Sequence, residues 1–275
     1  MNNKIIIAID AMGGENAPYK NIEGIALFLK KNKKKDDVFF NIFGNENLIK
    51  KEISKYNILP KKYKIFPSST VVSDEDTPLT AIKNSKDSSM WNAINSQIIS
   101  NSNITLSAGN TGVLFVVSRM LLKTIESVSK PALAGLWPSE KNMSVVLDLG
   151  ANVECDEKNL IDFSEMGAAL YKALFPGDIP KVALLNIGSE EIKGTENLKK
   201  AHSKLKEISV YGDFEFNGFI EGNKITKGES NVIVTDGFTG NIALKTAEGT
   251  AKFITDSLKK SLTSTLLSKF SIIFS

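Results

Sequence analysis

The sequence contains very few residues of the kinds that usually carry covalent or metal chemistry. Its 275 residues include one cysteine, Cys155, and one histidine, His202. A single cysteine excludes an intrachain disulfide and a cysteine-rich zinc site, and a single histidine excludes a multi-histidine metal site. No apolar run approaches the roughly 20 residues that span a bilayer, and the N-terminus lacks the pattern of a secretion signal. The sequence therefore predicts a soluble, cytoplasmic protein with no metal site.

The charges are nearly balanced, which argues against a nucleic-acid partner. Lysine and arginine number 34 against 31 acidic residues, a formal net charge of +3. Nucleic-acid-binding domains carry a larger basic excess. The lysine cluster at 30–35 has no aromatic residues among it, so it is interpreted as a solvated helix end. The hydrophobic share is 42%, which is ordinary for a folded protein of one large or two small domains.

Short apolar runs recur along the chain, most of them followed by a glycine-rich turn and then a helical stretch. The runs are Lys4–Ile9, Val38–Phe43, Ile104–Leu106, Ser144–Leu147, Val182–Leu185 and Asn231–Thr235. Helices are expected near 18–34, 46–56, 90–100, 112–123, 157–174, 195–207 and 240–262. Apolar runs without alternation are typical of strands buried on both faces, and intervening helices indicate crossover connections. The pattern predicts an α/β protein with a mostly parallel sheet.

Polar residues gather in the turns after the predicted strands. They are Asp10, Asn110, Asp148 with Asn152, Asn186, and Asp236 with Asn241. Tight-turn geometry explains any one of them. In an open parallel sheet, ligands bind beyond the carboxyl ends of the strands. Five such turns on one edge therefore favour a binding site.

The turn Ser107–Gly112 has the composition of a phosphate-binding loop. Gly109 and Gly112 let backbone N–H groups approach an anion, Ser107 and Thr111 add hydroxyls, and a helix N-terminus follows. The turn lacks the lysine of a Walker A loop, and neither this turn nor Asp10–Gly14 matches the dinucleotide fingerprint. A nicotinamide cofactor is therefore disfavoured.

Two further residues have the right chemistry beside predicted strand ends. Lys193 could neutralise a phosphate or an oxyanion as a point charge, or form a surface ion pair. Asn241 could offer its amide to an oxyanion, or cap a helix. Ser88 and Ser89 begin a predicted helix, where they could cap it or touch phosphate.

The single cysteine and the single histidine are not expected to act in catalysis. Cys155 follows a strand-end loop, but no histidine is near it in sequence, so a small packing role is favoured. His202 lies in a predicted helix among lysines and is expected at the surface.

Six motifs in order resemble those of the bacterial acyl-ACP:phosphate acyltransferases of phospholipid synthesis, over almost the whole chain. The motifs are Asp10–Gly14, Lys86–Met90, Ser107–Gly112, Leu147–Val153, Leu184–Gly188 with Lys193–Gly194, and Asp236–Asn241 with Leu244–Thr246. The resemblance implies a three-layer α/β/α fold related to the isocitrate and isopropylmalate dehydrogenases. It also implies a homodimer without an organic cofactor.

The implied reaction moves a long-chain acyl group from acyl carrier protein (ACP) to inorganic phosphate. The acyl phosphate then passes to a membrane glycerol-3-phosphate acyltransferase. On this basis we expect Lys193 and Asn241 to be catalytic. The residues expected to bind phosphate or substrate are Asp10, Gly13, Gly14, Ser88, Ser89, Ser107, Gly109, Asn110, Thr111, Gly112, Asp148, Asn152, Asn186, Gly188, Asp236 and Gly240.

The last residues depart from the family pattern. Residues 1–257 are expected to form the catalytic α/β domain. Residues 258–275 resemble the first helix and apolar tip of a hairpin that, in relatives, builds the dimer contact and touches the inner face of the plasma membrane. The rest of that hairpin and the elements after it are absent. Two alternatives stay open: a phosphotransacetylase-like enzyme that uses acyl-CoA, and a truncated, inactive family member.

Overall fold

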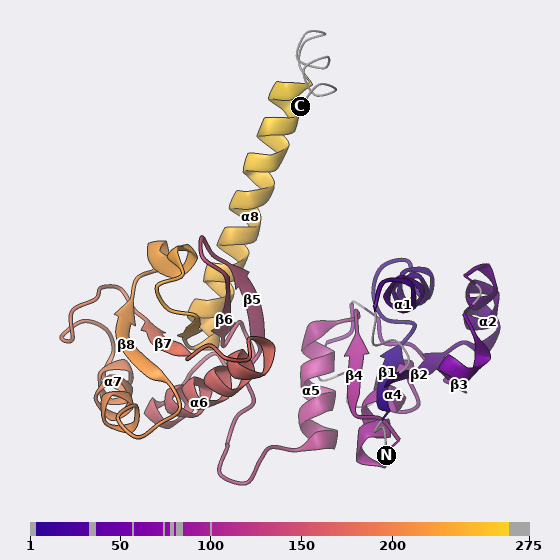
Figure 1. The fold of residues 1–275 in the computed structure, drawn as a ribbon, viewed down its shortest axis with the longest axis horizontal. Helices are drawn as coiled ribbons and strands as arrows, with labels where there is room; N and C mark the ends of the chain where they lie inside the picture. The colour runs from indigo at the N-terminus through magenta and orange to yellow at the C-terminus, as the bar shows by residue number, and fades with distance from the viewer. Residues whose placement is uncertain are drawn as a thin grey trace. The chain divides into compact units, whose positions relative to one another are not determined.

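The computed structural model describes residues 4–32, 37–56, 58–73, 75–77, 80, 85–99 and 101–263. The chain divides into two compact units, residues 1–125 and residues 126–275, and Figure 1 labels the elements of each. Each unit has its own sheet and its own core.

The first unit is built on a four-stranded parallel sheet with the strand order β3-β2-β1-β4. Its elements are β1 (Ile5–Asp10), α1 (Tyr19–Lys31), β2 (Val38–Gly44), α2 (Glu46–Lys55), a 3-10 helix (Pro60–Lys62), β3 (Tyr63–Pro67), α4 (Ser89–Ile98), β4 (Ile104–Ser107) and α5 (Thr111–Leu122). Asp10 and Ser107 are register partners at the carboxyl ends of neighbouring strands. The register therefore brings their two loops together.

Helices cover both faces of this sheet. On one face Ile9 packs with Ile22 and Ile25 of α1 and Ile49 of α2. On the other, Ala8 packs against Ala93 of α4. Successive strand residues point to opposite faces, so neighbouring residues of β1 contribute to different cores.

The second unit is built on a five-stranded sheet with the order β5-β6-β9-β7-β8. Its elements are β5 (Ala134–Pro138), β6 (Met143–Leu147), α6 (Glu157–Leu174), β7 (Lys181–Leu185), α7 (Glu196–Ile208), β8 (Glu215–Ile220), a 3-10 helix (Gly222–Lys227), β9 (Val232–Val234) and α8 (Gly237–Leu262). Only β5 runs antiparallel to its neighbour. The carboxyl ends of β6, β9 and β7 therefore lie side by side.

This sheet is also covered on both faces. Val145 and Leu147 of β6 pack against α6 and α7, in a core that includes Phe163 and Leu205. Val146 faces the opposite side, where the core includes Leu244 of α8. The central strands β6, β7 and β9 are almost wholly buried, as their unbroken apolar sequences predicted.

The predicted fold class is confirmed: the chain is an α/β protein with mostly parallel sheets and flanking helices. The described residues form two sheets, one in each unit, where the sequence indicated one. All seven expected helices are present. Strands β3, β5 and β8 were not predicted. The expectation of strands buried on both faces is wrong for β4, an edge strand on which Ile104 and Leu106 are about half exposed.

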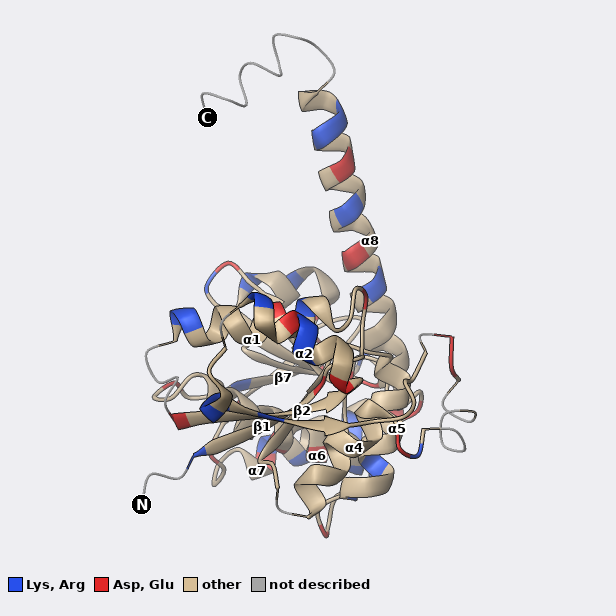
Figure 2. Ribbon diagram, turned by 90° about the vertical axis from the view of Figure 1, so that its right-hand side faces the viewer, with Lys and Arg blue, Asp and Glu red and all other residues tan. Residues whose placement is uncertain are grey.

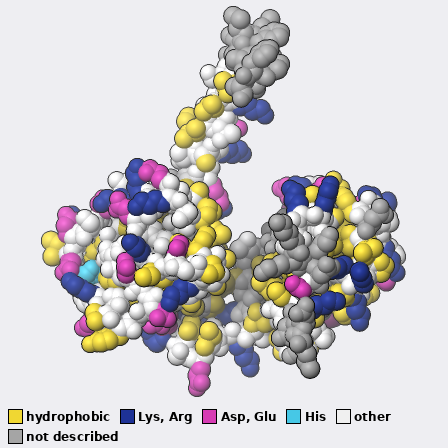
Figure 3. Space-filling model, in the orientation of Figure 1, with side chains coloured by type: hydrophobic (Ala, Val, Ile, Leu, Met, Phe, Trp, Pro, Cys, Tyr) yellow, Lys and Arg dark blue, Asp and Glu magenta, His cyan; other side chains and the backbone are white. Residues whose placement is uncertain are grey.

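Helix α8 continues without interruption through the expected domain boundary at residue 257. Hydrophobic side chains lie along one side of it in Figure 3, and its exposed apolar residues include Phe253, Ile254, Leu258 and Leu262. Basic and acidic residues alternate along the same helix in Figure 2. No helix within the described part of the chain is long and apolar enough to cross a membrane. The expected apolar tip, residues 264–275, lies outside the described residues.

Candidate functional site

In the first unit, a short hydrogen-bond chain joins the loops after β1 and β4. The Ser107 hydroxyl donates to Oδ2 of Asp10 at 2.7 Å, and the backbone N–H of Gly109 donates to Ser107 Oγ at 3.1 Å. The Met12 N–H donates to Oδ1 of Asp10 at 3.3 Å. One carboxylate therefore orders the start of both loops.

Two glycines allow the loops to touch. A Cβ on Gly13 would lie 2.5 Å from Asp10 Oδ2 and 2.9 Å from the Gly109 nitrogen. Gly14 has φ +86°, and a Cβ there would lie 2.6 Å from the Ala108 carbonyl oxygen. Real Cβ atoms do not approach so closely, so only glycine permits this contact. The sequence had placed both glycines beside the Ser107–Gly112 loop, and the structure brings them together.

Two helices begin beside these loops. The Asn110 side chain caps α5 by accepting from the Val113 N–H at 3.1 Å, which leaves Thr111 and Gly112 exposed in the first turn. The Ser88 hydroxyl caps α4 by accepting from the Trp91 N–H at 3.1 Å. The loop Ser107–Gly112 thus combines the close-packed Gly109 with a helix N-terminus, an arrangement that favours anions.

The next residue, Ser89, differs from the capping serine. Its hydroxyl is 1% exposed and, like that of Ser85, has no hydrogen-bond partner within the described part of the chain. Ser88 therefore has a structural role as a cap, and the substrate role expected for Ser89 stays a prediction.

Asn21 is a site residue that the sequence analysis missed. Its side-chain amide donates to the carbonyl oxygens of Ala11 and Gly13, both at 3.0 Å. The residue ties helix α1 to the loop that contains the close-packed glycines. An asparagine in the first turns of a helix carries no sequence signal that separates this role from a solvated one.

In the second unit, the buried carboxylate of Asp148 organises the loop after β6. It is 0% exposed. Oδ1 accepts from the N–H groups of Leu133, Gly150 and Ala151, and Oδ2 accepts from the Asn152 N–H and side-chain amide. The five hydrogen bonds, between 2.7 and 3.1 Å, use the acceptor capacity of the carboxylate. Asp148 therefore shapes the loop, and the substrate role expected for it stays a prediction.

Helix α8 begins directly against this loop. The Asp236 side chain caps the helix by accepting from the Thr239 N–H at 2.8 Å. A Cβ on Gly240 would collide with the Asp148 carbonyl oxygen, and one on Gly237 would lie 2.6 Å from the Asn152 carbonyl oxygen. Asn241 is exposed in the second turn of α8, beside Gly150. Because Asp236 caps α8, the helix does not need Asn241 as its N-terminal cap.

The loop after β7 presents Lys193. The buried Asn186 side chain closes this loop: its amide donates to the Lys193 carbonyl at 3.1 Å and its Oδ1 accepts from the Ile187 N–H at 2.8 Å. A Cβ on Gly188 would lie 3.2 Å from Lys193 Cγ. The lysine side chain is exposed, so a fixed backbone carries an accessible cation.

The predicted residues therefore separate into exposed and buried groups. Lys193 and Asn241 are exposed at the carboxyl edge of the second sheet, above the buried residues Asp148, Asn152, Asn186, Gly188 and Gly240. The first unit gathers Asp10, Gly13, Gly14, Ser107 and Gly109. The chain has one arginine, Arg119, which lies in the last turn of α5.

The cysteine and the histidine are packing groups. Cys155 packs against the core of the second unit, and burial raises the pKa of its thiol to about 11, so it is not a thiolate at neutral pH. His202 is only 8% exposed, with its ring 4.6 Å from that of Phe219 and 5.2 Å from that of Phe216. The expectation of a surface histidine is wrong, because its helix turns this side chain toward the aromatic residues of β8.

Burial lowers the pKa of His202, the effect of Glu191 opposing it. In residues 4–263, as far as the structure describes them, no three His, Cys, Asp or Glu side chains are grouped so as to hold a metal ion.

Sequence comparison finds close relatives across almost the whole chain. The family model described as "Fatty acid synthesis protein" matches residues 5–274. A phosphate acyltransferase of Pelagibacter ubique is 53% identical over 98% of this chain and 80% of its own length. One from Maricaulis maris is 39% identical over 96% of this chain and 74% of its own length.

Solved structures share the fold. The EutD phosphotransacetylase from Staphylococcus aureus matches with a TM-score of 0.64 at 15% identity, covering 91% of this chain and 83% of its own. A phosphotransacetylase from Streptococcus pyogenes matches with a TM-score of 0.64 at 13% identity, covering 90% and 82%. At these identities the likeness concerns the fold alone.

Proposed function

The chain belongs to the fatty acid synthesis protein family and is an enzyme that transfers an acyl group to phosphate, and we propose that its acyl donor is a long-chain acyl-ACP. The product is then an acyl phosphate. The sequence similarity to phosphate acyltransferases and the α/β fold of phosphotransacetylases support the type of reaction. The donor and the product are our inference.

In the proposed reaction, phosphate is the nucleophile. A phosphate oxygen forms a bond to the thioester carbon, which becomes tetrahedral as the electrons of the C=O π bond move to its oxygen and make it an oxyanion. The carbon–sulfur bond then breaks. The thiolate of the phosphopantetheine arm leaves and takes up a proton, and the acyl group stays on phosphate. No electrons are exchanged, so this chemistry requires no redox cofactor. It requires no acylated enzyme, because phosphate attacks the thioester directly.

One observation carries this mechanism: both of the chain's usual candidates for covalent catalysis are packing groups. The thiol of Cys155 has a pKa of about 11, and the ring of His202 is enclosed by phenylalanines. A serine nucleophile needs an adjacent base, and the one histidine is buried in that aromatic cluster. A direct attack by phosphate therefore fits these residues best.

The strand-end loops supply what such an attack requires. We assign phosphate to the Ser107–Gly112 loop, where glycine contacts and the α5 N-terminus favour an anion. We assign charge neutralisation to Lys193 and a hydrogen bond to the oxyanion or phosphate to Asn241. Preorganised donors of this kind are often the largest single contribution to acyl transfer. Asp148, Asn152 and Asn186 then act as positioning residues.

The proposal extends to the partners of the enzyme. The acyl phosphate is passed to a membrane glycerol-3-phosphate acyltransferase, so the enzyme works at the membrane surface. The exposed apolar side of α8, with Phe253, Ile254 and Leu258, supports a homodimer contact or a membrane-surface contact through this helix.

The direct test is to incubate the purified chain with palmitoyl-ACP and phosphate and to trap acyl phosphate with hydroxylamine. Palmitoyl-CoA is assayed in parallel, because the structural likeness to phosphotransacetylases makes an acyl-CoA donor the second candidate. We expect product from palmitoyl-ACP and no acylated protein by mass spectrometry. A preference for palmitoyl-CoA would mean that the donor is an acyl-CoA and not an acyl-ACP. A folded chain that forms no product from either thioester would contradict the proposal.

A further inference from the structure

The segment Ser127–Leu133, which we call the strap, lies along the loop that follows β6 in the second unit. It contains no helix or strand, yet five of its seven residues are hydrogen-bonded to that loop or to the start of α6. The Leu133 N–H donates to Asp148 Oδ1 at 3.1 Å, and the Pro131 carbonyl accepts from the Asn152 amide at 2.7 Å. The strap therefore helps to hold the loop that contains Asp148 and Asn152.

Lys130 is the one charged residue of the strap. Its side chain is half-buried, and its ammonium group donates to the Glu154 carbonyl oxygen at 2.9 Å. Hydrogen bonds from a charged donor are stronger than those between neutral groups. Because Asn152 and Glu154 are two residues apart, the strap holds this turn of the loop at two points.

Two carboxylates share the surroundings of Lys130. Burial raises the pKa of the Cys155 thiol, the charge of Lys130 opposes this rise, and the charges of Asp148 and Asp236 add to it. All three charges therefore lie within electrostatic reach of one thiol. Asp148 is 0% exposed, and a buried carboxylate is costly unless a positive charge and hydrogen bonds compensate it. Lys130 is placed to supply that charge.

The loop transmits this constraint to helix α8. The Asn152 carbonyl accepts from the Gly237 N–H at 2.8 Å, and neither Gly237 nor Gly240 has room for a Cβ against the loop. Asn241 follows directly in the helix, beside Gly150 of the loop. A shift of the loop at Asn152 would therefore move the helix start that presents the Asn241 amide.

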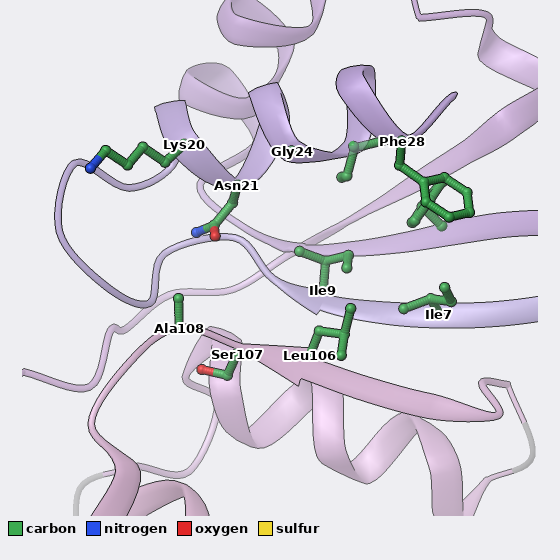
Figure 4. Close-up of a pocket in the computed structure, with 11 residues that line it drawn as sticks. Ile7, Ile9, Lys20, Asn21, Gly24, Phe28, Leu106, Ser107 and Ala108 are labelled. Atoms are coloured by element: carbon green, nitrogen blue, oxygen red, sulfur yellow. The ribbon is translucent and has the colours of Figure 1, made fainter. Parts of the chain in front are cut away.

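The first unit contains a comparable arrangement. Asn21 lines the pocket that Figure 4 shows, and its amide donates to the carbonyl oxygens of Ala11 and Gly13. In both units, a side-chain N–H group from outside a strand-end loop holds backbone carbonyls of that loop. Lys130 differs from Asn21 in its charge, which also acts on the carboxylates around it.

We propose that Lys130 is a positioning residue for Asn241: its ammonium group holds the loop at Glu154, and the loop holds the start of the helix that carries the Asn241 amide. This inference rests on the proposed function, in which that amide donates to the oxyanion or to phosphate. A displaced donor stabilises the transition state less well. Loss of Lys130 should therefore lower kcat more than it changes KM.

The first test measures the loop without catalysis. Hydrogen exchange of the backbone N–H groups of residues 148–156 and 237–241 is followed in the full chain, in Lys130→Met and in Lys130→Arg. Methionine keeps an apolar stem without the charge, whereas arginine keeps both. Lys172→Met is the matched control, because Lys172 is also half-buried in the second unit and pairs with Asp213 from the last turn of α6.

We expect exchange in both segments to be at least tenfold faster in Lys130→Met and close to that of the parent chain in Lys130→Arg and Lys172→Met. Unchanged exchange in Lys130→Met would overturn the proposal. Equally faster exchange throughout the second unit would overturn it too, because that result reports a loss of overall stability and not a loosened loop.

The second test asks whether Lys130 acts through Asn241. Lys130→Met should lower kcat about tenfold, with little change in the KM for either substrate, and Lys172→Met should not lower it. In an Asn241→Ala background, Lys130→Met should have no further effect, because no amide is left to position. A full tenfold loss in that background would overturn the positioning role. If the parent chain turns over no thioester, the proposed function fails, while hydrogen exchange still decides whether Lys130 holds the loop.

Discussion

The two units each use an aspartate at a strand end to order a loop, but they use it differently. Asp10 ends β1 and accepts hydrogen bonds from the Ser107 hydroxyl and the Met12 N–H. Asp148 follows β6, is fully buried and accepts five hydrogen bonds. Close glycine contacts accompany both carboxylates, so the units differ in the number of donors that the carboxylate holds: two for Asp10 and five for Asp148.

The difference indicates how each loop meets a ligand. The loop after β6 is fixed by the hydrogen bonds of Asp148, and the exposed Asn241 of α8 lies beside Gly150 of that loop. The loops after β1 and β4 meet at Gly13 and Gly14, and the second of them leads into the N-terminus of α5. The second unit therefore offers an exposed side chain beside a rigid loop, and the first offers a helix N-terminus beside close-packed glycines, which favours an anion.

The comparison predicts the largest effect on stability at Asp148. Removing this carboxylate in Asp148→Ala takes the acceptor away from five N–H donors, and a buried donor left unpaired costs about 1–3 kcal/mol. Neighbouring groups will recover part of that, so we expect the second unit to lose about 4 kcal/mol. Asp10→Ala should cost the first unit about 1–2 kcal/mol, because fewer donors lose their acceptor.

The chain has two tryptophans, Trp91 in the first unit and Trp137 in the second, so each unit has its own fluorescent reporter. Urea unfolding is followed at Trp137 in a Trp91→Phe background and at Trp91 in a Trp137→Phe background. Equal losses from the two aspartate variants would show that the two loops are ordered alike.

Among substitutions that should leave folding unchanged, Lys193→Ala is expected to reduce turnover most. Its side chain is exposed, so Lys193→Ala should leave the free energy of unfolding unchanged. Loss of a preorganised charge at the reacting centre costs about 3 kcal/mol, so kcat/KM should fall about 10²-fold. Asn241→Ala should behave similarly, because its amide is exposed at the same sheet edge.

Lys204→Ala is the matched control for Lys193→Ala. Lys204 is also exposed, and its ion pair with Glu207 lies on α7, where such pairs contribute about 0–1 kcal/mol. Near-normal turnover in Lys193→Ala and Asn241→Ala would refute the assignment of both side chains to the reaction.

Sequence patterns predicted the central strands because burial on both faces demands unbroken apolar runs, as in Val182–Leu185. They did not predict β8, in which Gly218 and the polar Asn217 interrupt the run, nor the antiparallel β5. Edge position, not local sequence, stabilises such strands. The half-exposed Leu106 shows the same limit, because an edge strand need not be covered on both faces.

The motifs of the candidate site could be predicted from the sequence, but the role of each residue in them could not. The composition of Ser107–Gly112 indicated an anion loop. Nothing local to Asp148 separates a buried organiser from a substrate ligand, because that depends on the N–H groups that fold around it. Likewise, the lysines around His202 in the sequence suggested a surface position, while the aromatic residues that bury it come from β8.

A smaller effect, mainly on phosphate binding, is expected from a Cβ on a glycine of the loops of the first unit. In Gly13→Ala the new methyl group would lie 2.5 Å from Asp10 Oδ2 and 2.9 Å from the Gly109 nitrogen, so the loops must separate. We expect the KM for phosphate to rise about tenfold, or 1.4 kcal/mol, with a smaller change in kcat. Gly222→Ala is the control, since a Cβ there meets nothing within 4 Å. An unchanged KM for phosphate would place the anion elsewhere.

The smallest expected effect is a change of the free energy of unfolding with pH. It should differ between the two units, because the chain's one histidine lies in the second. Burial lowers the pKa of His202 below its ordinary value of 6.5, so below pH 6.5 the unfolded chain binds a proton that the native ring does not. The free energy of unfolding of the second unit should therefore fall as the pH decreases from 6.5 toward the native pKa. One proton limits that slope to about 1.4 kcal/mol per pH unit.

His202→Gln isolates this contribution, because glutamine does not titrate. Glu191, whose charge favours the protonated ring, and Lys206, whose charge opposes it, remain in both proteins. Urea unfolding followed at Trp137 between pH 5 and 8 should give curves of stability against pH that diverge below pH 6.5, with the parent chain falling more steeply. Unfolding followed at Trp91 should show no such divergence, since the titrating ring is not part of the first unit. Parallel curves at Trp137 would mean that the native ring takes up its proton as readily as the unfolded chain, against the burial between Phe216 and Phe219.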